Sequence, residues 1–271
     1  MYDFAEKTVM VTGGSMGIGA AFAQELARRR ARLVLVARSA ERLRTLAEDL
    51  TKTHGVRVDV VAEDLARPGA AKRVLEAVRA KGLVIDVLIN NAGFGMYGPF
   101  EELPLETQRE EIDLNIGALV ELTHVFLPDL ERRQGGVIQV ASTAAFQPVP
   151  FMAVYAASKA FVLSFSEALW AEYRERGVRV LALCPGATDT PFFARAGEAA
   201  AFGRKASAED VVRVGLAAFD ANRSHVVHGF GNYFTALMSR WATREFTARL
   251  SAKLMRPKPL LVATGRSGSS P

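Results

Sequence analysis

A glycine-rich segment lies between the first apolar run of the chain and the first helical pattern, and its position constrains the fold more than any other feature. The apolar run Thr8–Thr12 has the length of a strand, and the sequence continues as Thr12-Gly-Gly-Ser-Met-Gly-Ile-Gly19. Glycine permits positive φ angles and close approach of a ligand, and a helix N-terminus offers unpaired N–H groups to phosphate. The placement favours a phosphate-binding loop over a turn without a ligand. The residues expected to hold a pyrophosphate are Gly13, Ser15, Met16, Gly17, Ile18 and Gly19.

Apolar runs of strand length alternate with helical patterns along most of the chain. Several runs are continuously apolar, as in strands that helices cover on both faces. Repeated strand–helix–strand units with right-handed crossovers give a doubly wound parallel sheet. Strands are expected at Thr8–Thr12, Arg32–Ala37, Val56–Ala62, Val84–Asn90, Gly136–Ser142, Arg179–Cys184 and His225–His228. Helices are expected at roughly 17–30, 40–53, 68–80, 104–131, 152–176 and 208–221.

The chain has no Pro/Gly/Ser-rich linker in its middle, so a single α/β domain is expected. We assign residues 1–231 to this domain, 232–264 to an amphipathic helical extension of it, and 265–271 to a disordered tail of small and polar residues. The net charge is +5 overall, but the segment from residue 232 onward carries +6, so residues 1–231 carry −1. The seven basic residues of that segment, set against one acid (Glu245), are Arg240, Arg244, Arg249, Lys253, Arg256, Lys258 and Arg266.

Composition restricts the function classes. A single cysteine, Cys184, allows no internal disulfide and fits a reducing compartment. The first seven residues lack the apolar region of a secretory signal, and no apolar stretch reaches the roughly 18 residues of a spanning helix, so a cytoplasmic protein is expected. The four histidines show no metal-ligand spacing, so no metal site is expected. Because the excess positive charge is confined to the C-terminal end, no nucleic-acid partner is expected.

The end of the second strand selects the nucleotide. An acidic residue there binds a ribose 2′-hydroxyl, whereas a cation accommodates a 2′-phosphate. The sequence reads Val36-Ala37-Arg38-Ser39, and no acid follows until Glu41. Arg38 can offer a planar fork to phosphate and Ser39 a hydroxyl, which favours NADP(H) over NAD(H), although Arg38 could instead be a solvated surface charge. Asp64 and Leu65, after the third strand, are placed either to touch the adenine or to form an ordinary turn.

Tyr155 and Lys159 lie four residues apart, with Ser142 upstream. This spacing puts a phenol and an ammonium on one face of a helix, one turn apart. A phenol ordinarily titrates near ~10, and a neighbouring positive charge favours its anion, so we expect Lys159 to lower the pKa of Tyr155 toward the working range. Such a pair predicts acid–base chemistry beside the nucleotide.

Taken together, these segments resemble the short-chain dehydrogenase/reductase family. The glycine motif of residues 12–19, Asn90-Asn-Ala-Gly93, Asn115, Ser142, Tyr155-x-x-x-Lys159 and Pro185-Gly186 match the family pattern in register over about residues 5–230. The resemblance implies a Rossmann-type, doubly wound, seven-stranded parallel sheet with helices on both faces. Within the family the chain looks most like the DltE-like reductases, near fatty-acyl and steroid-type ketone reductases.

The resemblance also implies roles for individual residues. Tyr155 exchanges a proton with the carbonyl or alcohol oxygen, Lys159 lowers the pKa of Tyr155 and binds the nicotinamide ribose, and Ser142 binds the reacting oxygen. Asn115 bends its helix and holds a water in a proton relay to Lys159. The remaining cofactor contacts are expected from Asn91, Ala92, Gly93, Pro185, Gly186 and Thr188.

The loops beyond the strand ends, 94–97, 144–152 and 187–202, carry many aromatic residues and few charges. They favour a hydrophobic substrate pocket, although about half of the aromatic residues could instead pack in the core. The pocket residues expected are Phe94, Ala144, Phe151 and Phe192.

The main functional prediction is an NADP(H)-dependent oxidoreductase that reduces a carbonyl, or oxidises a secondary alcohol, on a hydrophobic substrate. One alternative is a 3-oxoacyl-carrier-protein/CoA-type reductase, and an alternative of another class is a non-catalytic NADPH-sensing regulator. Helices 104–131 and 152–176 carry apolar faces that predict a homodimer or homotetramer. The basic extension could dock on an anionic membrane or an acyl carrier, but a helix packed across the pocket or against a subunit is favoured.

Overall fold

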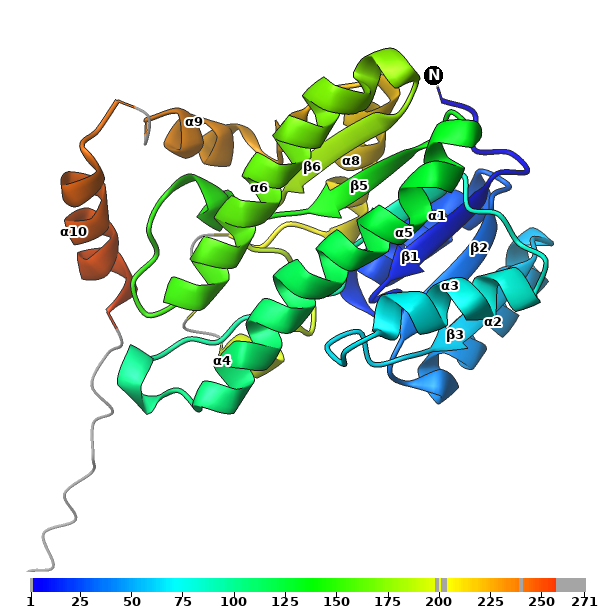
Figure 1. Ribbon diagram of the computed structural model, residues 1–271. Coiled ribbons are helices and arrows are strands. Elements are labelled where there is room, and N and C mark those ends of the chain that lie inside the picture. The colour runs from blue at the N-terminus through cyan, green and yellow to red at the C-terminus, as the bar shows by residue number, and fades with distance from the viewer. Residues whose placement is uncertain (1, 198–199, 201–203, 239–240, 257–271) are drawn as a thin grey trace, which may run out of the picture.

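The computed structural model describes residues 2–197, 200, 204–238 and 241–256. Seven parallel strands form one sheet in the order β3-β2-β1-β4-β5-β6-β7 (Figure 1). The order reverses between β1 and β4, as in a doubly wound sheet, and this reversal is where such sheets bind ligands. The strands are β1 (Thr8–Thr12), β2 (Arg32–Ala37), β3 (Val58–Ala62), β4 (Val87–Asn90), β5 (Gly136–Val140), β6 (Arg179–Cys184) and β7 (His225–Val227).

Helices cover both faces of this sheet because successive strand residues point to opposite sides. In β1, Val9 and Val11 pack in the cluster with α1 (Gly17–Arg28), α2 (Ala40–His54) and α8 (Ala208–Asp220). Met10 packs in the other cluster, with α3 (Ala70–Ala80), α5 (Leu119–Arg132) and the end of α6 (Ala153–Tyr173). All five residues of β1 are buried, which explains why the apolar runs read as continuous.

The segment predicted as one helix over 104–131 is interrupted. It consists of α4 (Leu105–Ile112), a π-helical turn η2 (Asp113–Ala118) and α5. The wide turn contains Asn115, the residue expected to bend the helix. Three short 3-10 helices complete this part of the chain: η1 (Phe100–Glu102), η3 (Thr143–Phe146) and η4 (Arg174–Arg176).

The C-terminal extension, which was expected to be helical, contains two helices. α9 (Phe230–Met238) and α10 (Arg244–Met255) lie to one side of the sheet, apart from the two helical layers (Figure 1). The Thr243 hydroxyl accepts a hydrogen bond from the Phe246 N–H and so caps the start of α10. A further short helix, α7 (Phe192–Ala196), was not predicted. The tail 265–271 and residues 257–264 of the extension lie outside the described residues.

Candidate active site

A cavity of about 1110 Å³ opens along the carboxyl ends of the strands, on both sides of the switch between β1 and β4. It runs from the glycine loop past the end of β2 to Tyr155 and Lys159. The predicted site residues that line it are Gly13, Ser15, Met16, Gly17, Ile18, Arg38, Ser39, Asp64, Leu65, Asn91, Ala92, Gly93, Phe94, Ser142, Ala144, Tyr155, Lys159, Pro185, Gly186, Thr188 and Phe192. Three predicted site residues, Gly19, Asn115 and Phe151, do not line it.

The glycine loop has the backbone that its sequence requires. Gly13 and Gly17 have φ angles of 63° and 55°, in the left-handed region that favours glycine. Gly19 was expected to help hold a pyrophosphate, but it does not line the cavity and lies behind the glycine loop. A Cβ at Gly19 would come within 2.2 Å of the Gly13 carbonyl oxygen, so glycine there permits the strand and helix to meet.

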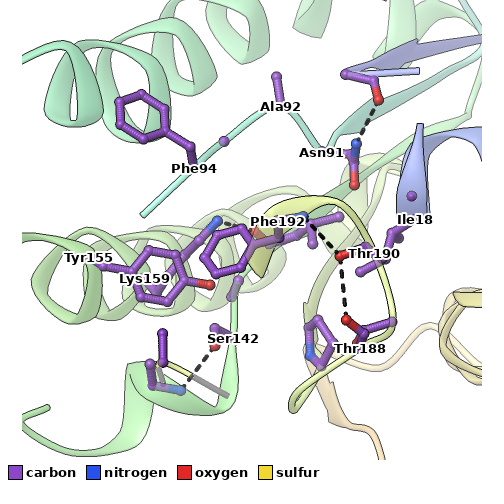
Figure 2. Close-up of a pocket in the computed structure, with 18 of the residues that line it drawn as sticks. Ile18, Asn91, Ala92, Phe94, Ser142, Tyr155, Lys159, Thr188, Thr190 and Phe192 are labelled. Carbon is purple, nitrogen blue, oxygen red and sulfur yellow. Dashed lines mark hydrogen bonds between the residues drawn. The ribbon is translucent and has the colours of Figure 1, made fainter. Parts of the chain in front are cut away.

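Thr12 and Asn91 join this loop to the end of β4. The Thr12 hydroxyl accepts hydrogen bonds from the backbone N–H groups of Asn91 (3.0 Å) and Ala92 (3.1 Å). The Asn91 amide in turn donates to the carbonyl oxygens of Thr12 (2.9 Å) and Gly13 (3.2 Å). The side chain of Asn91 therefore fixes the two loops of the switch point together (Figure 2).

The end of β2 supplies cations to the cavity. Arg38, Ser39 and Arg42 all line it. The Ser39 hydroxyl accepts from the Arg42 N–H and caps α2, and it keeps its own hydrogen to donate to a ligand. Arg42, one turn further along, was not singled out from the sequence. Asp64 accepts from the Ala66 N–H at 3.2 Å and so forms the turn that was the alternative to an adenine contact, while still lining the cavity.

Lys159 lies in a buried position beside the tyrosine. Its ammonium donates a 2.8 Å hydrogen bond to the Val140 carbonyl oxygen at the end of β5, and lies 5.7 Å from the centre of the Tyr155 ring. Only 6% of Lys159 is exposed. Burial lowers the pKa of Lys159 to about 8, while the nearby Glu111 carboxylate opposes the shift.

The pKa of Tyr155 departs from the expectation. Burial raises the pKa of the phenol to about 12, against the hydrogen bond with Ser142, which lowers it. The expected lowering of the Tyr155 pKa by Lys159 is wrong: burial and the Glu111 carboxylate raise this pKa, and only the hydrogen bond with Ser142 lowers it. Tyr155 is therefore a protonated phenol at neutral pH, the form that donates a proton to a carbonyl oxygen.

Asn115 acts on the loop after β4. Its amide donates to the Phe94 carbonyl oxygen (2.9 Å) and to the Ser158 hydroxyl (3.1 Å), and accepts from the Phe94 N–H (3.1 Å). A Cβ at Gly93 would lie 2.8 Å from the side-chain amide oxygen of Asn115, so glycine lets the loop after β4 approach Asn115 closely. These contacts place Asn115 behind the cavity wall, where it orients the loop that carries Phe94.

The loop after β6 lines one side of the cavity. The Pro185 carbonyl oxygen accepts from the Thr143 N–H (2.9 Å), and the Thr188 hydroxyl donates to the Gly186 carbonyl oxygen (3.0 Å). A Cβ at Gly186 would lie 2.3 Å from the Asn232 amide nitrogen, which shows how closely α9 packs on this loop. Thr190, further along, lies against Gly17 of the glycine loop.

The substrate end of the cavity is largely apolar. Phe192 lies over Tyr155, with 5.4 Å between the ring centres (Figure 2). Phe151 was expected in the substrate pocket, but it does not line the main cavity. Its ring packs on Tyr97, with 6.3 Å between the ring centres, and lines a separate small cavity. The backbone of Phe151 has a φ angle of 66°, and this left-handed turn carries its side chain away from the main cavity.

Besides Arg42, one charged residue of the site was missed from the sequence. Glu111, on α4, is 1% exposed and shares the small cavity with Tyr155. Glu111 precedes Asn115 by four residues, a spacing that places both on one helical face. Its position beside Tyr155 depends on the packing of α4 on α6, which the sequence does not show. As in the favoured expectation of a helix packed across the pocket, α10 reaches the cavity with Thr247, Leu250, Ser251, Leu254 and Met255.

The described residues offer neither a metal site nor a reactive thiolate. Among them, no group of three or more His, Cys, Asp or Glu side chains could hold a metal ion. Cys184 is buried, and burial raises the pKa of its thiol to about 12, which disfavours the reactive thiolate. None of the helices described is long and apolar enough to cross a bilayer.

Comparison with known proteins agrees with the fold. The chain is 38% identical over 186 residues to mouse (Mus musculus) 17-beta-hydroxysteroid dehydrogenase type 3, covering 67% of this chain and 60% of that protein. It is 37% identical over 183 residues to very-long-chain 3-oxoacyl-CoA reductase of Anas platyrhynchos, covering 65% of this chain and 58% of that protein. The chain thus spans about three fifths of the length of these relatives.

A solved short-chain dehydrogenase from Sphingobium yanoikuyae, in complex with NADPH, superposes with a TM-score of 0.78 at 34% identity and covers 87% of this chain and 94% of that one. A family model described as short chain dehydrogenase matches residues 7–201. This match covers well over half of the sequence and includes the glycine loop, Asn115, Ser142, Tyr155 and Lys159. The protein belongs to the short-chain dehydrogenase family.

Proposed function

We propose that the protein is an NADP(H)-dependent carbonyl reductase, or alcohol dehydrogenase in the opposite direction, that acts on an apolar substrate. The observation that carries the proposal is the continuity of one cavity from the glycine loop to Tyr155, Lys159 and Ser142. A dinucleotide held by its phosphates at one end of this cavity extends to a proton donor at the other. The DltE-like branch remains our proposal for its place within the family.

The residues present fit a phosphorylated dinucleotide. Gly13 and Gly17 leave room for the pyrophosphate, where a side chain would have to adopt a strained backbone. At the end of β2 the lining residues are Arg38, Ser39 and Arg42, which suit a 2′-phosphate. The similarity to a structure in complex with NADPH supports the same preference.

Catalysis would combine three side chains with the nicotinamide, which supplies the hydride for reduction. Tyr155, protonated at neutral pH, gives its proton to the substrate oxygen. Ser142 interacts with the Tyr155 phenol and is placed to bind the same oxygen. Lys159, held by Val140 at the strand end, keeps a positive charge near the phenol and is placed to bind the nicotinamide ribose.

The cavity walls favour an apolar substrate. Phe192, Phe193 and Met152 line the end near Tyr155, with Leu250 and Leu254 from α10. The names of two relatives, a hydroxysteroid dehydrogenase and a very-long-chain 3-oxoacyl-CoA reductase, support the steroid-like and acyl classes. A 3-oxoacyl thioester reductase is therefore the second candidate, because its long chain would also fit this apolar lining.

Turnover of a panel of ketones, measured by NADPH consumption, tests the proposal. We expect activity on apolar ketones and 3-oxoacyl thioesters, and a loss of at least about 1,000-fold in kcat for Tyr155→Phe, with the NADPH affinity retained. Tyr173→Phe, on the same helix outside the cavity, is the control and should keep wild-type activity. NADPH binding without turnover of any substrate would favour the NADPH-sensing regulator, and full activity of Tyr155→Phe would contradict the site.

We also propose a homodimer or homotetramer built on α4, α5 and α6. Leu105 and Ile112 on α4 and Phe161 on α6 are exposed apolar side chains that such an interface would bury. Light scattering on the purified protein measures the assembly state, and a strict monomer would contradict this expectation.

A further inference from the structure

Exposed apolar side chains are concentrated on the C-terminal extension. Of the fourteen large hydrophobic residues that are exposed in the described part of the chain, nine belong to residues 230–254. Phe230 and Trp241 are 85% and 81% exposed, values far above those of ordinary surface apolar residues that pack partly on neighbours. We call these nine the C-terminal apolar surface: Phe230, Tyr233, Phe234, Leu237, Met238, Trp241, Phe246, Leu250 and Leu254.

Positive charge accompanies this surface. Arg244, Arg249, Lys253 and Arg256 lie on or next to α10, against a single carboxylate, Glu245. Glu245 pairs with Arg249 at 2.6 Å. The extension is cationic while residues 1–231 carry a net charge of −1, so the charge is localised where the apolar side chains are.

The extension is attached to the body at the cavity. Ser251 and Met255 of α10 are buried, and the Tyr97 hydroxyl donates a 2.7 Å hydrogen bond to the Met255 carbonyl oxygen. Leu250 and Leu254 both line the cavity and are about half exposed, 48% and 55%. The C-terminal apolar surface therefore continues from the outside of α10 into the wall of the cavity.

We propose that α9 and α10 dock the protein peripherally on an anionic lipid bilayer. Aromatic residues such as Trp241 and Tyr233 favour the boundary between headgroups and acyl chains, and long cationic side chains can reach anionic headgroups from there. Each Lys or Arg near an anionic membrane raises the affinity on the order of five-fold. None of the described helices is both long and apolar enough to cross a bilayer.

A second copy of the chain fits this surface less well. A two-fold interface places the same patch of both subunits face to face, so the cations Arg244, Lys253 and Arg256 would face the equally cationic patch of the second copy. An acidic carrier protein would match the cations, but would leave the outlying Phe230 and Trp241 without an apolar partner. An anionic bilayer offers negative headgroups to the cations and an apolar layer to the exposed aromatic and aliphatic side chains.

The position of the surface gives the docking a consequence, which rests on the proposed function. Because Leu250 and Leu254 belong to both the surface and the cavity wall, an apolar substrate dissolved in the membrane would reach Tyr155 without crossing water. Binding of the protein to lipid is independent of turnover, so the two ideas fail separately.

Flotation of the full chain with vesicles tests the docking. The vesicles contain phosphatidylcholine alone or with about 30% phosphatidylglycerol, at low and high salt. We expect binding to the anionic vesicles, a decrease of at least about five-fold without phosphatidylglycerol, and a similar decrease at high salt. The double variant Trp241→Glu/Phe246→Glu should lose at least ten-fold in binding while keeping wild-type turnover of a water-soluble ketone, because neither residue lines the cavity.

Two controls separate the alternatives. Phe100→Glu changes a phenylalanine outside the extension that is as exposed as Phe246, 60% each, and should bind vesicles like the wild type. Lys253→Glu should weaken binding to anionic vesicles only, whereas Lys72→Glu on α3 should not. Absence of wild-type binding, or equal binding by the double variant, overturns the proposal. If light scattering shows that the wild type is an oligomer and that the double variant is a monomer, the C-terminal apolar surface is a subunit interface.

Discussion

The Tyr97 phenol donates a 2.7 Å hydrogen bond to the carbonyl oxygen of Met255, which joins the loop after β4 to the last turn of α10. The two residues are separated by 158 positions in the chain. Burial raises the pKa of Tyr97, so the phenol remains a donor at neutral pH. This bond fixes one end of the helix that completes the apolar wall of the cavity.

Tyr97→Phe should loosen that wall without changing the chemistry. Loss of one hydrogen bond costs about 1 kcal/mol, so we expect the KM for an apolar ketone to rise about five-fold, with little change in kcat. Steady-state kinetics measure both constants. Tyr233→Phe, which removes a half-exposed phenol from α9, serves as the control. A large fall in kcat for Tyr97→Phe would instead show that the bond positions the reacting groups.

Arg38→Asp should reverse the nucleotide preference. The change removes a charge-assisted partner of the 2′-phosphate and adds a carboxylate that can bind a ribose 2′-hydroxyl. We expect the ratio of kcat/KM for NADPH over NADH to fall on the order of 100-fold. Arg44→Asp, on α2 but outside the cavity lining, should leave the ratio unchanged. An unaltered ratio in Arg38→Asp would assign the phosphate to another residue, with Arg42 the first to examine.

Lys159 should make stability depend on pH. Burial lowers its pKa from 10.5 to about 8, so between these values the unfolded chain holds a proton that the folded protein has released. The free energy of unfolding contributed by this residue therefore rises with pH across that window, by up to about 3 kcal/mol. Urea unfolding of the wild type and of Lys159→Met at pH 7.5 and 10 measures the difference.

The exposed Lys72 provides the comparison for this experiment, because Lys72→Met should shift stability by the same amount at both pH values. A wild-type minus Lys159→Met difference that does not grow with pH would show that the ammonium keeps its ordinary pKa in the folded protein.

Glu111 should set the pH range of the reaction. Its carboxylate raises the pKa of both Tyr155 and Lys159, so Glu111→Gln should lower both values. Reduction needs a protonated phenol, and the alkaline limb of the kcat/KM profile should therefore move to lower pH. The other groups that act on the pair are the neutral Ser142 hydroxyl, through its hydrogen bond to Tyr155, and the buried Cys184, which acts on Lys159.

Glu106→Gln, on the exposed side of the same helix, should leave the profile of kcat/KM against pH in place. If Glu111→Gln reduced the rate equally at every pH, Glu111 would only support the packing of α4 on α6.

The parts of the site that sequence could predict are those fixed by local chain geometry. The glycine loop between β1 and α1 and the spacing of Tyr155 and Lys159 depend on residues that are neighbours along the chain. The seven-stranded parallel sheet was predicted for the same reason, since each strand–helix unit has its own periodicity. The errors at strand ends, such as residues 84–86 before β4, concern positions where pairing is decided by the adjacent strand.

The parts that sequence missed depend on tertiary contacts. The pKa of Tyr155 was expected to fall because Lys159 is near in sequence, but burial by Phe192 and the surrounding loops dominates. Phe151 was assigned to the pocket by its position in a loop, and only its left-handed backbone shows that it turns away. The break between α9 and α10 was hidden because the apolar residues alone fit a continuous amphipathic pattern.

The π-helical turn at Asp113–Ala118 joins α4 to α5. The side chain of Asn115, inside the turn, accepts a hydrogen bond from the Phe94 N–H and donates one to the Phe94 carbonyl oxygen. One turn earlier, Glu111 reaches the cavity behind Tyr155. One helical segment therefore sets both the position of the loop that carries Phe94 and the electrostatic environment of the Tyr155 phenol.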